Sequence, residues 1–364
     1  MKPPLATPGR TAGRVDPQTH GQERRQGTSG LRRPRVWLLT GAAALLVAGT
    51  LFTAADVDGD SRYDVLSLLR SAGRDIGSLQ WQYLCVVLAL AALHYLASAV
   101  AARSAAGIPL PLGETLVVQF AAAAANRLTP AGIGAAAINV RYFTRRGLRL
   151  PAALGAVTAL NVLGAVADLI VLSILVFGGQ WLGLSGGAKE ITLLARHVAQ
   201  LVAPFGSPWL WTAAIALVAG LAVISIRSRR AGRTRHWRQY WTSIGRLLRR
   251  PASLASLMTA SGATTLILGF AFVASAAMVP GPIPQESLGA LLIGYMIGAA
   301  AGSAVPTPAG IGSTETALVA ILIAAQVPAS HAVEDVLVFR VLTFWLPAAL
   351  GVLALRRLNR RRAL

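Results

Sequence analysis

Long apolar runs, separated by short polar or charged segments, make up most of the chain after residue 35. A run of about 20 apolar residues can cross the hydrocarbon core of a bilayer as a helix, which satisfies its own backbone hydrogen bonds. The alternating pattern of barrel strands is absent from the sequence. The pattern therefore predicts an all-α, multi-pass membrane protein. The six runs that are long enough to span are Val36–Ala55, Gln82–Ala102, Ala152–Phe177, Pro208–Ile226, Ser253–Val279 and Ala332–Leu355.

Two further apolar stretches are interrupted by a repeated hexapeptide, Thr-Pro-Ala-Gly-Ile-Gly, at residues 129–134 and 307–312. Proline cannot donate a backbone hydrogen bond and glycine permits tight turns, so each copy should break a helix. Most of the flanking arms are shorter than a membrane span, and we expect each pair to form a re-entrant hairpin that enters and leaves on one side. The first has arms Leu112–Ala125 and Ala135–Tyr142 around a break at Asn126–Gly134, and the second has arms Leu288–Ala304 and Ser313–Gln326 around a break at Val305–Gly312.

The positions of the charged residues predict the topology. The net charge is +20, yet only 13% of the residues are charged, which is too few for a typical soluble domain. Basic clusters lie before residue 36, around the first hairpin, in segment 227–250 and after residue 355. All of them fall on one side if the six runs cross and the hairpins do not, so the positive-inside rule predicts that both termini are cytoplasmic. We interpret the basic excess as a topology signal and a contact for anionic lipid head groups, and we expect no nucleic-acid partner.

With this topology, the first hairpin opens from the cytoplasm and the second from the outside. The chain then contains an inverted repeat, at about residues 80–177 and 252–355. The repeat lies in a membrane domain over residues 35–355, between a disordered basic tail at 1–34 and a basic tail at 356–364. Inverted repeats with broken helices are typical of secondary transporters, whose binding site lies where the breaks approach each other.

The breaks themselves are candidates for ligand binding. A helix that restarts after each break would point free N–H groups and a positive dipole end into the protein, an arrangement that binds phosphate and other anions. Compact helix packing by Pro-Gly turns is the alternative explanation, and two copies in inverted settings favour a function. The backbone candidates are Pro130, Gly132, Gly134, Pro308, Gly310 and Gly312.

Charged residues at membrane depth are costly and usually functional. Arg127 precedes the first break and Arg340 lies in the last apolar run, so their guanidinium groups could neutralise a phosphate. Glu315 follows the second break, where a carboxylate would in any case favour the helix dipole. Asp168 lies deep in the third predicted span, where it could simply pair with an arginine. Arg141 is a secondary candidate, with an interfacial, snorkelling position as the alternative.

Other chemistry has little support in the sequence. No zinc, nucleotide-binding or nucleophile motif is present, so we expect no metal, no cofactor and no enzymatic activity. The acidic run Asp56–Asp60 lacks the glycine position and the final glutamate of an EF-hand loop. The single cysteine, Cys85, cannot form an intrachain disulfide.

One segment of the second half carries a resemblance to a known family. The sequence PTPAGIGSTE at Pro306–Glu315 is followed by RVLTFWLP at Arg340–Pro347 and by Gly351. This order resembles the lysylphosphatidylglycerol synthase transmembrane-region family, whose members are also called flippase-like integral membrane proteins. The first-half counterpart is NRLTPAGIG at Asn126–Gly134, and the resemblance covers about residues 80–355.

The resemblance implies a bacterial cytoplasmic membrane protein whose membrane region moves a modified phospholipid, or another lipid-linked group, between leaflets. It adds Pro306 to the candidates and implicates the turn residues together with Arg127, Glu315 and Arg340. Many relatives carry a Gly-Glu pair after the first break, whereas three alanines follow Gly134 here. The synthase proper also needs a soluble aminoacyl-transferase domain, and this chain ends nine residues after its last predicted span. We therefore expect no aminoacyl transfer by this chain alone.

Our leading hypothesis is translocation of a phospholipid, or of a lipid-linked phosphorylated substrate, across the cytoplasmic membrane. Arg127 and Arg340 would hold the phosphate, and Glu315 would supply a counter-charge or proton coupling. A membrane-embedded transferase that acts on a lipid phosphate, with Glu315 or Asp168 as acid or base, is the alternative. A third hypothesis is an accessory subunit of a separately encoded lipid-modifying enzyme.

Overall fold

The computed structural model describes residues 80–127, 129, 133–178, 234–278, 288–304 and 312–360, which form helices and short connections without strands. The predicted all-α class is confirmed for this part of the chain. The helices in chain order are α3 (Trp81–Ala106), α4 (Leu112–Arg127), α5 (Ile133–Arg145), α6 (Leu150–Gly178), α9 (Thr234–Leu248), α10 (Pro251–Ala276), α11 (Leu288–Ala304), α12 (Ser313–Ala324), α13 (Ala329–Arg340), the π-helical turn η4 (Val341–Trp345) and α14 (Leu346–Arg360).

Four helical segments are long and apolar enough to cross a membrane. They are Trp81–Ala106, Leu150–Gly178, Pro251–Ala276 and Ala329–Leu358, and the last combines α13, η4 and most of α14. They coincide with four of the six predicted spans. The other two predicted spans, at 36–55 and 208–226, and the predicted tail at 1–34 lie outside the described residues.

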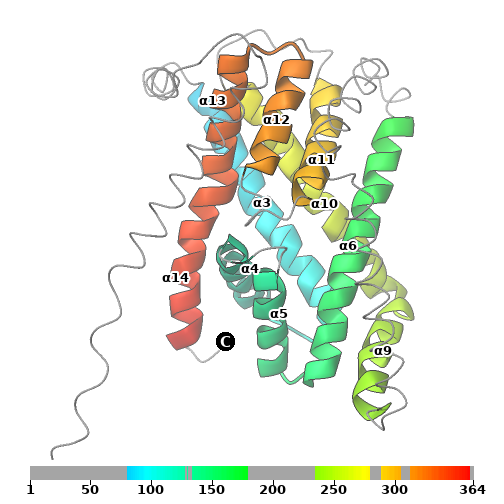
Figure 1. Ribbon diagram of the computed structural model, residues 1–364. Coiled ribbons are helices and arrows are strands. Elements are labelled where there is room, and N and C mark those ends of the chain that lie inside the picture. The colour runs from blue at the N-terminus through cyan, green and yellow to red at the C-terminus, as the bar shows by residue number, and fades with distance from the viewer. Residues whose placement is uncertain are drawn as a thin grey trace, which may run out of the picture. The chain divides into compact units, whose positions relative to one another are not determined.

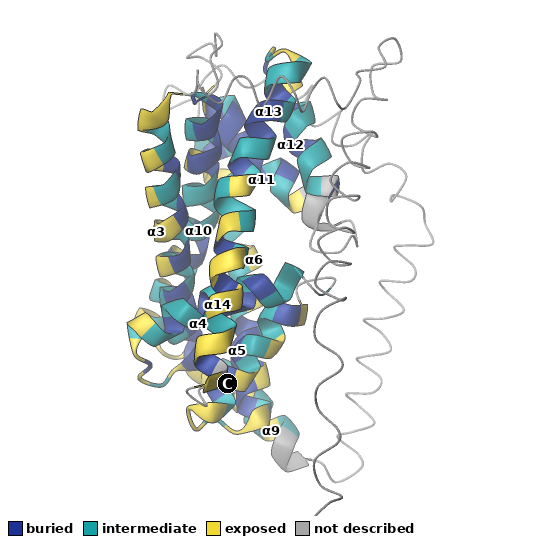
Figure 2. Cartoon of the chain, turned by 90° about the vertical axis from the view of Figure 1, so that its left-hand side faces the viewer, coloured by how far each residue is buried: buried dark blue, intermediate teal, exposed yellow. Residues whose placement is uncertain are grey.

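Local sequence signals mark several ends of these helices. Helix α3 ends at Gly107, whose φ of 65° is the left-handed conformation that commonly closes a helix. Helix α10 begins at Pro251, where the missing N–H costs no hydrogen bond. Helix α6 exposes large apolar side chains along its length, among them Leu169, Ile174 and Phe177. Helix α14 also carries exposed residues on its outer face (Figure 2), and Leu350 and Leu353 are among its exposed apolar residues. Such a face suits contact with lipid tails rather than with water.

The two interrupted segments form helix hairpins (Figure 1). Helix α4 packs beside α5, and α11 packs beside α12. Each observed arm ends within three residues of its predicted boundary, and α11 matches the prediction at both ends. Separate helices therefore flank each hexapeptide, α4 and α5 the first and α11 and α12 the second.

The hairpins pack at opposite ends of the last span. Helix α12 contacts the α13 half of that span, whereas α4 contacts the α14 half (Figure 1). Two hydrophobic clusters reflect this division, because Phe339 belongs to the cluster that contains α11 and α12 residues, and Leu358 belongs to the cluster of α4 and α5. An inverted repeat requires this arrangement, and the symmetry itself stays a prediction.

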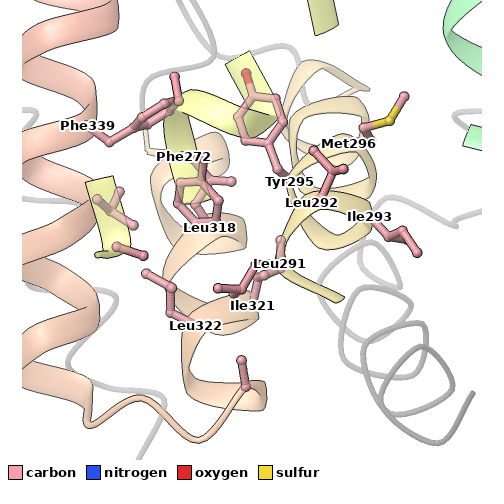
Figure 3. Close-up of a cluster of buried hydrophobic side chains, with 14 of the residues drawn as sticks. Phe272, Leu291, Leu292, Ile293, Tyr295, Met296, Leu318, Ile321, Leu322 and Phe339 are labelled. Atoms are coloured by element: carbon pink, nitrogen blue, oxygen red, sulfur yellow. The ribbon is translucent and has the colours of Figure 1, made fainter. Parts of the chain in front are cut away.

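Two close contacts fix the last span against its neighbours. A Cβ atom on Gly351 would collide with the carbonyl oxygen of Phe120, so only glycine lets α14 approach the α4 backbone this closely. On the α13 half, the Phe339 ring lies 5.3 Å from the Phe272 ring and 5.7 Å from the Tyr295 ring, between centroids (Figure 3). These aromatic pairs hold α13 against α10 and α11 immediately before Arg340.

Candidate functional site

The ring of Phe344, in the π-helical turn η4, is the point where the two predicted arginines meet. Arg127 ends α4, at the break of the first hairpin, and Arg340 ends α13. The guanidinium carbon of Arg127 lies 4.0 Å from the centroid of the Phe344 ring, and that of Arg340 lies 4.1 Å from it. Cation–π attraction to this ring offsets part of the cost of placing two cations close together. Single π-helical turns inside α-helices often mark functional sites.

Arg340 is neutralised by Glu315. One carboxylate oxygen of Glu315 lies 2.6 Å from both Nε and one terminal nitrogen of Arg340. The other oxygen accepts a hydrogen bond of 2.7 Å from the backbone N–H of Gly312, at the start of α12. Glu315 therefore caps its own helix and binds the arginine at the same time, so the dipole explanation and the ion-pair explanation both hold.

Gly312 must be glycine for this cap to form. Its φ of 93° lies in the left-handed region, which side-chain-bearing residues rarely adopt. The backbone turn directs the Gly312 N–H at the Glu315 side chain three residues later. The second break thus presents an amide that is already bound to a carboxylate.

Arg127 has no carboxylate partner among the described residues. Its terminal nitrogens donate to two backbone carbonyls, those of Ala123 at 2.5 Å and Phe344 at 2.6 Å. Its Nε is buried and has no acceptor in the part of the chain that the structure describes. The phenol of Tyr95 on α3, stacked on the Phe120 ring, interacts with the Arg127 guanidinium both by charge and by a side-chain hydrogen bond, but a neutral phenol does not cancel the positive charge. The site as described therefore carries one uncompensated positive charge, and that charge is on Arg127.

In the first hairpin, the neutral hydroxyl of Thr129 binds the backbone where α5 begins. The Thr129 hydroxyl accepts a hydrogen bond of 2.7 Å from the Gly134 N–H and donates one of 3.2 Å to the Ala125 carbonyl. A Cβ atom on Gly134 would collide with both the Thr129 hydroxyl and the Ala125 carbonyl. The hydroxyl therefore bridges the end of α4 to the start of α5 without adding charge.

Asp168 pairs with a threonine, and the alternative interpretation of this residue, a pairing with an arginine, is not seen among the described residues. Its carboxylate accepts a hydrogen bond of 2.6 Å from the Thr265 hydroxyl of α10. The buried Tyr295 is within electrostatic reach of both Asp168 and Arg340, but no contact joins Asp168 to either arginine among the described residues. Arg141 is exposed on α5, and no contact joins it to Arg127 or Arg340 in the described segments.

The remaining predicted site residues, Pro130, Gly132, Pro306, Pro308 and Gly310, lie outside the described residues. Three residues that contribute to the site were not predicted. Phe344 lies four residues after Arg340, Thr129 opens the first hexapeptide, and Tyr95 lies in an apolar run. The helical spacing of Arg340 and Phe344 is the one signal that could have indicated a shared face.

Comparison with known proteins gives a family for this arrangement. The sequence model of the family described as "Lysylphosphatidylglycerol synthase TM region" matches residues 38–351. The chain belongs to this family. The match includes both hairpins and all the charged residues of the site, and it confirms the resemblance drawn from the two motifs. No curated protein matches the chain.

Membership in the lysylphosphatidylglycerol synthase TM-region family, together with the apolar helices, identifies a multi-pass membrane protein. The family is a membrane region that is linked to lipid modification or flipping. Within that family, the chemistry available to the described residues of this site is electrostatic. It consists of one neutral Arg–Glu pair, in which a terminal nitrogen of Arg340 makes an ion-pair contact without a hydrogen bond, and of Arg127, whose Nε has no acceptor and which has no carboxylate partner among the described residues.

Proposed function

We propose that this protein translocates a phospholipid, or a lipid-linked phosphorylated substrate, across the cytoplasmic membrane, and that Arg127 binds the phosphate. Both termini lie on the cytoplasmic side in this proposal. The partner is an anionic or phosphorylated lipid, and the chain itself catalyses no covalent change.

The single observation that carries the proposal is the uncompensated charge of Arg127. A charged side chain within a membrane protein is costly unless a partner neutralises it. Arg127 keeps one buried donor, Nε–H, without an acceptor among the described residues. A phosphate group would supply both the negative charge and the acceptor, and the planar guanidinium suits phosphate oxygens.

The positions of the hairpins favour transport over static binding. The first hairpin packs at the α14 end of the last span and the second at the α13 end, and Phe344 lies between these halves. If the hairpins open to opposite sides, a substrate at Phe344 would be reachable from each side in turn. Access to the site from the two sides of the membrane in turn depends on the inverted repeat, which is part of the proposal.

The alternative is a membrane-embedded transferase with Glu315 or Asp168 as acid or base. Each oxygen of Glu315 already has a partner, Arg340 or the Gly312 N–H. With both oxygens bound to protein groups, Glu315 has no oxygen directed at a substrate, which favours an electrostatic role over proton transfer. An accessory subunit of a separate lipid-modifying enzyme is the third candidate, and the experiment below distinguishes all three.

The test uses the full chain, purified and reconstituted in vesicles that contain fluorescently labelled phosphatidylglycerol. Quenching of the outer-leaflet label by dithionite gives the rate at which inner-leaflet lipid becomes accessible. We expect Arg127→Ala to lower this rate about tenfold or more, because a hydrogen bond to a charged group contributes about 1.5–3 kcal/mol. Arg127→Lys should keep part of the activity, since it keeps the charge without the planar fork.

Arg146→Gln is the matched control. Arg146 also belongs to the first hairpin, where it pairs with Glu114, but both side chains are substantially exposed. This variant should exchange lipid at the wild-type rate. Wild-type vesicles that exchange no lipid contradict the function, and full activity of Arg127→Ala contradicts the role of Arg127. A covalently altered lipid in the mass spectrum supports the transferase, and neither exchange nor product supports the accessory subunit.

A further inference from the structure

A buried carboxyl group outside the arginine site carries a further inference. Asp335 lies in the middle of α13 and is 2% exposed. Neither of its carboxylate oxygens has a hydrogen-bond partner among the residues that the structure describes. The Arg–Glu pair and the Phe344 site make no use of this side chain.

The surroundings of Asp335 are mostly apolar. Ala332, Val336 and Phe339, on the same helix, are each no more than 2% exposed. The Ser275 hydroxyl of α10 is a polar neighbour, but it donates its hydrogen bond to the Phe272 carbonyl at 2.9 Å. A hydroxyl whose hydrogen is shared with the Phe272 carbonyl stabilises an ionised Asp335 only weakly, and its lone pairs could accept a hydrogen bond from a protonated one.

Few charged groups face Asp335 in the described structure. Helices α10 and α12 pack against α13, and α10 has no titratable side chain while α12 has only Glu315, which is bound to Arg340. On α11, Tyr295 packs against Phe339. The titratable neighbours on α13 itself are His331, Glu334 and Arg340.

An ionised carboxylate in this position would be expensive. Removing a charge from water costs several kcal/mol unless a close partner compensates it. A bound metal ion such as Ca²⁺ would require six or more oxygen ligands, and the apolar neighbours of Asp335 cannot provide them. A proton is the cation that a single carboxyl group can bind without further ligands.

Asp335 is positioned to influence the phosphate site. It lies five residues before Arg340 on the same helix, which corresponds to about 7.5 Å along the axis. With about 3.6 residues per turn, the two side chains lie on different faces of α13, so a change in the charge of Asp335 would reach Arg340 through movement of the helix rather than through direct contact. Phe339, one helical turn after Asp335, transmits any movement of α13 to Phe272 and Tyr295 (Figure 3).

We propose that Asp335 is a proton-binding site that couples the movement of the lipid phosphate to the transmembrane proton gradient. This inference rests on the proposed lipid translocation and adds an energy source to it. It transfers the coupling role from Glu315, whose oxygens are both occupied, to Asp335.

The first measurement is lipid exchange under an imposed pH gradient, in the labelled phosphatidylglycerol vesicles, with the membrane potential clamped. Wild-type exchange should change by up to about tenfold for one pH unit, because that unit represents 1.36 kcal/mol per proton. Asp335→Asn, which mimics the protonated side chain, should exchange lipid without responding to the gradient. Wild-type exchange that ignores the gradient overturns the coupling and leaves translocation intact, whereas the absence of any exchange overturns both.

The second measurement detects the proton directly, by infrared difference spectroscopy of the purified chain in lipid nanodiscs at two pH values. The wild-type spectrum should contain the carbonyl band of a protonated carboxylic acid, which Asp335→Asn removes and Asp168→Asn keeps. Asp335→Glu should keep a titrating band at a shifted frequency, which provides a test if the asparagine variant fails to fold. A band that persists unchanged in Asp335→Asn, or that does not shift in Asp335→Glu, overturns the assignment.

Discussion

The two hairpins contain the same hexapeptide, but they hold its last glycine in different ways. In the first hairpin, the Gly134 N–H donates to the neutral hydroxyl of Thr129. In the second, the Gly312 N–H donates to the carboxylate of Glu315. The residue that corresponds to Glu315 after the first hexapeptide is Ala137, which has no polar group.

This difference determines where positive charge is available. Glu315 neutralises Arg340, so the second hairpin contributes an ion pair. In the first hairpin, α4 ends at Arg127, which has no carboxylate partner among the described residues. A repeated backbone turn can thus provide an ion pair in one copy and, in our proposal, an anion site in the other. The sequence suggests that two arginines hold a phosphate in the same way, whereas in the structure the two arginines have different partners.

The largest effect on stability should come from breaking the ion pair of the second hairpin. Glu315→Gln leaves Arg340 partly buried without its carboxylate, and such a loss typically costs about 3–5 kcal/mol. We expect the lower end of that range, because the side chains of Arg340 and Glu315 keep 12% and 19% of their surface exposed. The free energy of unfolding in mixed detergent micelles measures this change.

Arg127→Ala is the matching change in the first hairpin. It removes a cation without leaving a carboxylate unpaired, so it should lower the free energy of unfolding less than Glu315→Gln does. It should lower the rate of lipid exchange more than Glu315→Gln does. The double variant Glu315→Gln with Arg340→Met should be less destabilised than the sum of the two single changes, since the partners are in contact. Equal destabilisation by Arg127→Ala and Glu315→Gln would show that the charge asymmetry is wrong.

The sequence predicts the elements of these hairpins well because their limits are local. The ends of α11 follow from an apolar run and a proline-glycine break, and both of its ends match the prediction. Proline and glycine act on the backbone at their own positions, so no tertiary contact is needed to locate the interruption. The four described spans follow from the same local apolar patterns.

Partners of the charged residues are less predictable, because they are not local. Sequence reasoning identified Glu315 and Arg340 separately, but only the fold places these residues, 25 positions apart, in contact. Asp168 is a site candidate from the sequence, with an arginine partner as the alternative, and its carboxylate accepts a hydrogen bond from the Thr265 hydroxyl, 97 positions away. Asp335 was missed, although an acidic residue within an apolar run is itself a signal of function.

A smaller loss of stability should reveal how closely the helices of each hairpin pack against their neighbours. Gly351→Ala would drive a Cβ atom into the backbone carbonyl of Phe120 on α4, which cannot move without displacing the helix. Overpacking of this kind typically costs about 1–3 kcal/mol. Gly298→Ala, on α11, would meet the end of the flexible Ile321 side chain and should cost less.

Thermal unfolding followed by size-exclusion chromatography in detergent compares these two variants. Helix propensity favours alanine over glycine equally at both positions, so the difference between the variants isolates the close contact. A Gly351→Ala protein as stable as the Gly298→Ala protein would mean that α14 does not approach the α4 backbone as described.

The smallest effect should come from the neutral cap of the first hairpin. Thr129→Val keeps the shape of the side chain but leaves the Gly134 N–H without its acceptor, at a cost of about 1–3 kcal/mol for a buried donor and less if water reaches it. Thr129→Ser keeps the hydroxyl and is the control. Hydrogen exchange at the Gly134 amide should accelerate in the valine variant and stay near the wild-type rate in the serine variant.

Because a neutral hydroxyl binds the Gly134 amide at the start of α5, the exchange rate of that amide should also be insensitive to Glu315→Gln. Faster exchange at Gly134 in that variant would show that the two caps act as one unit, and the contrast between the hairpins would then be lost.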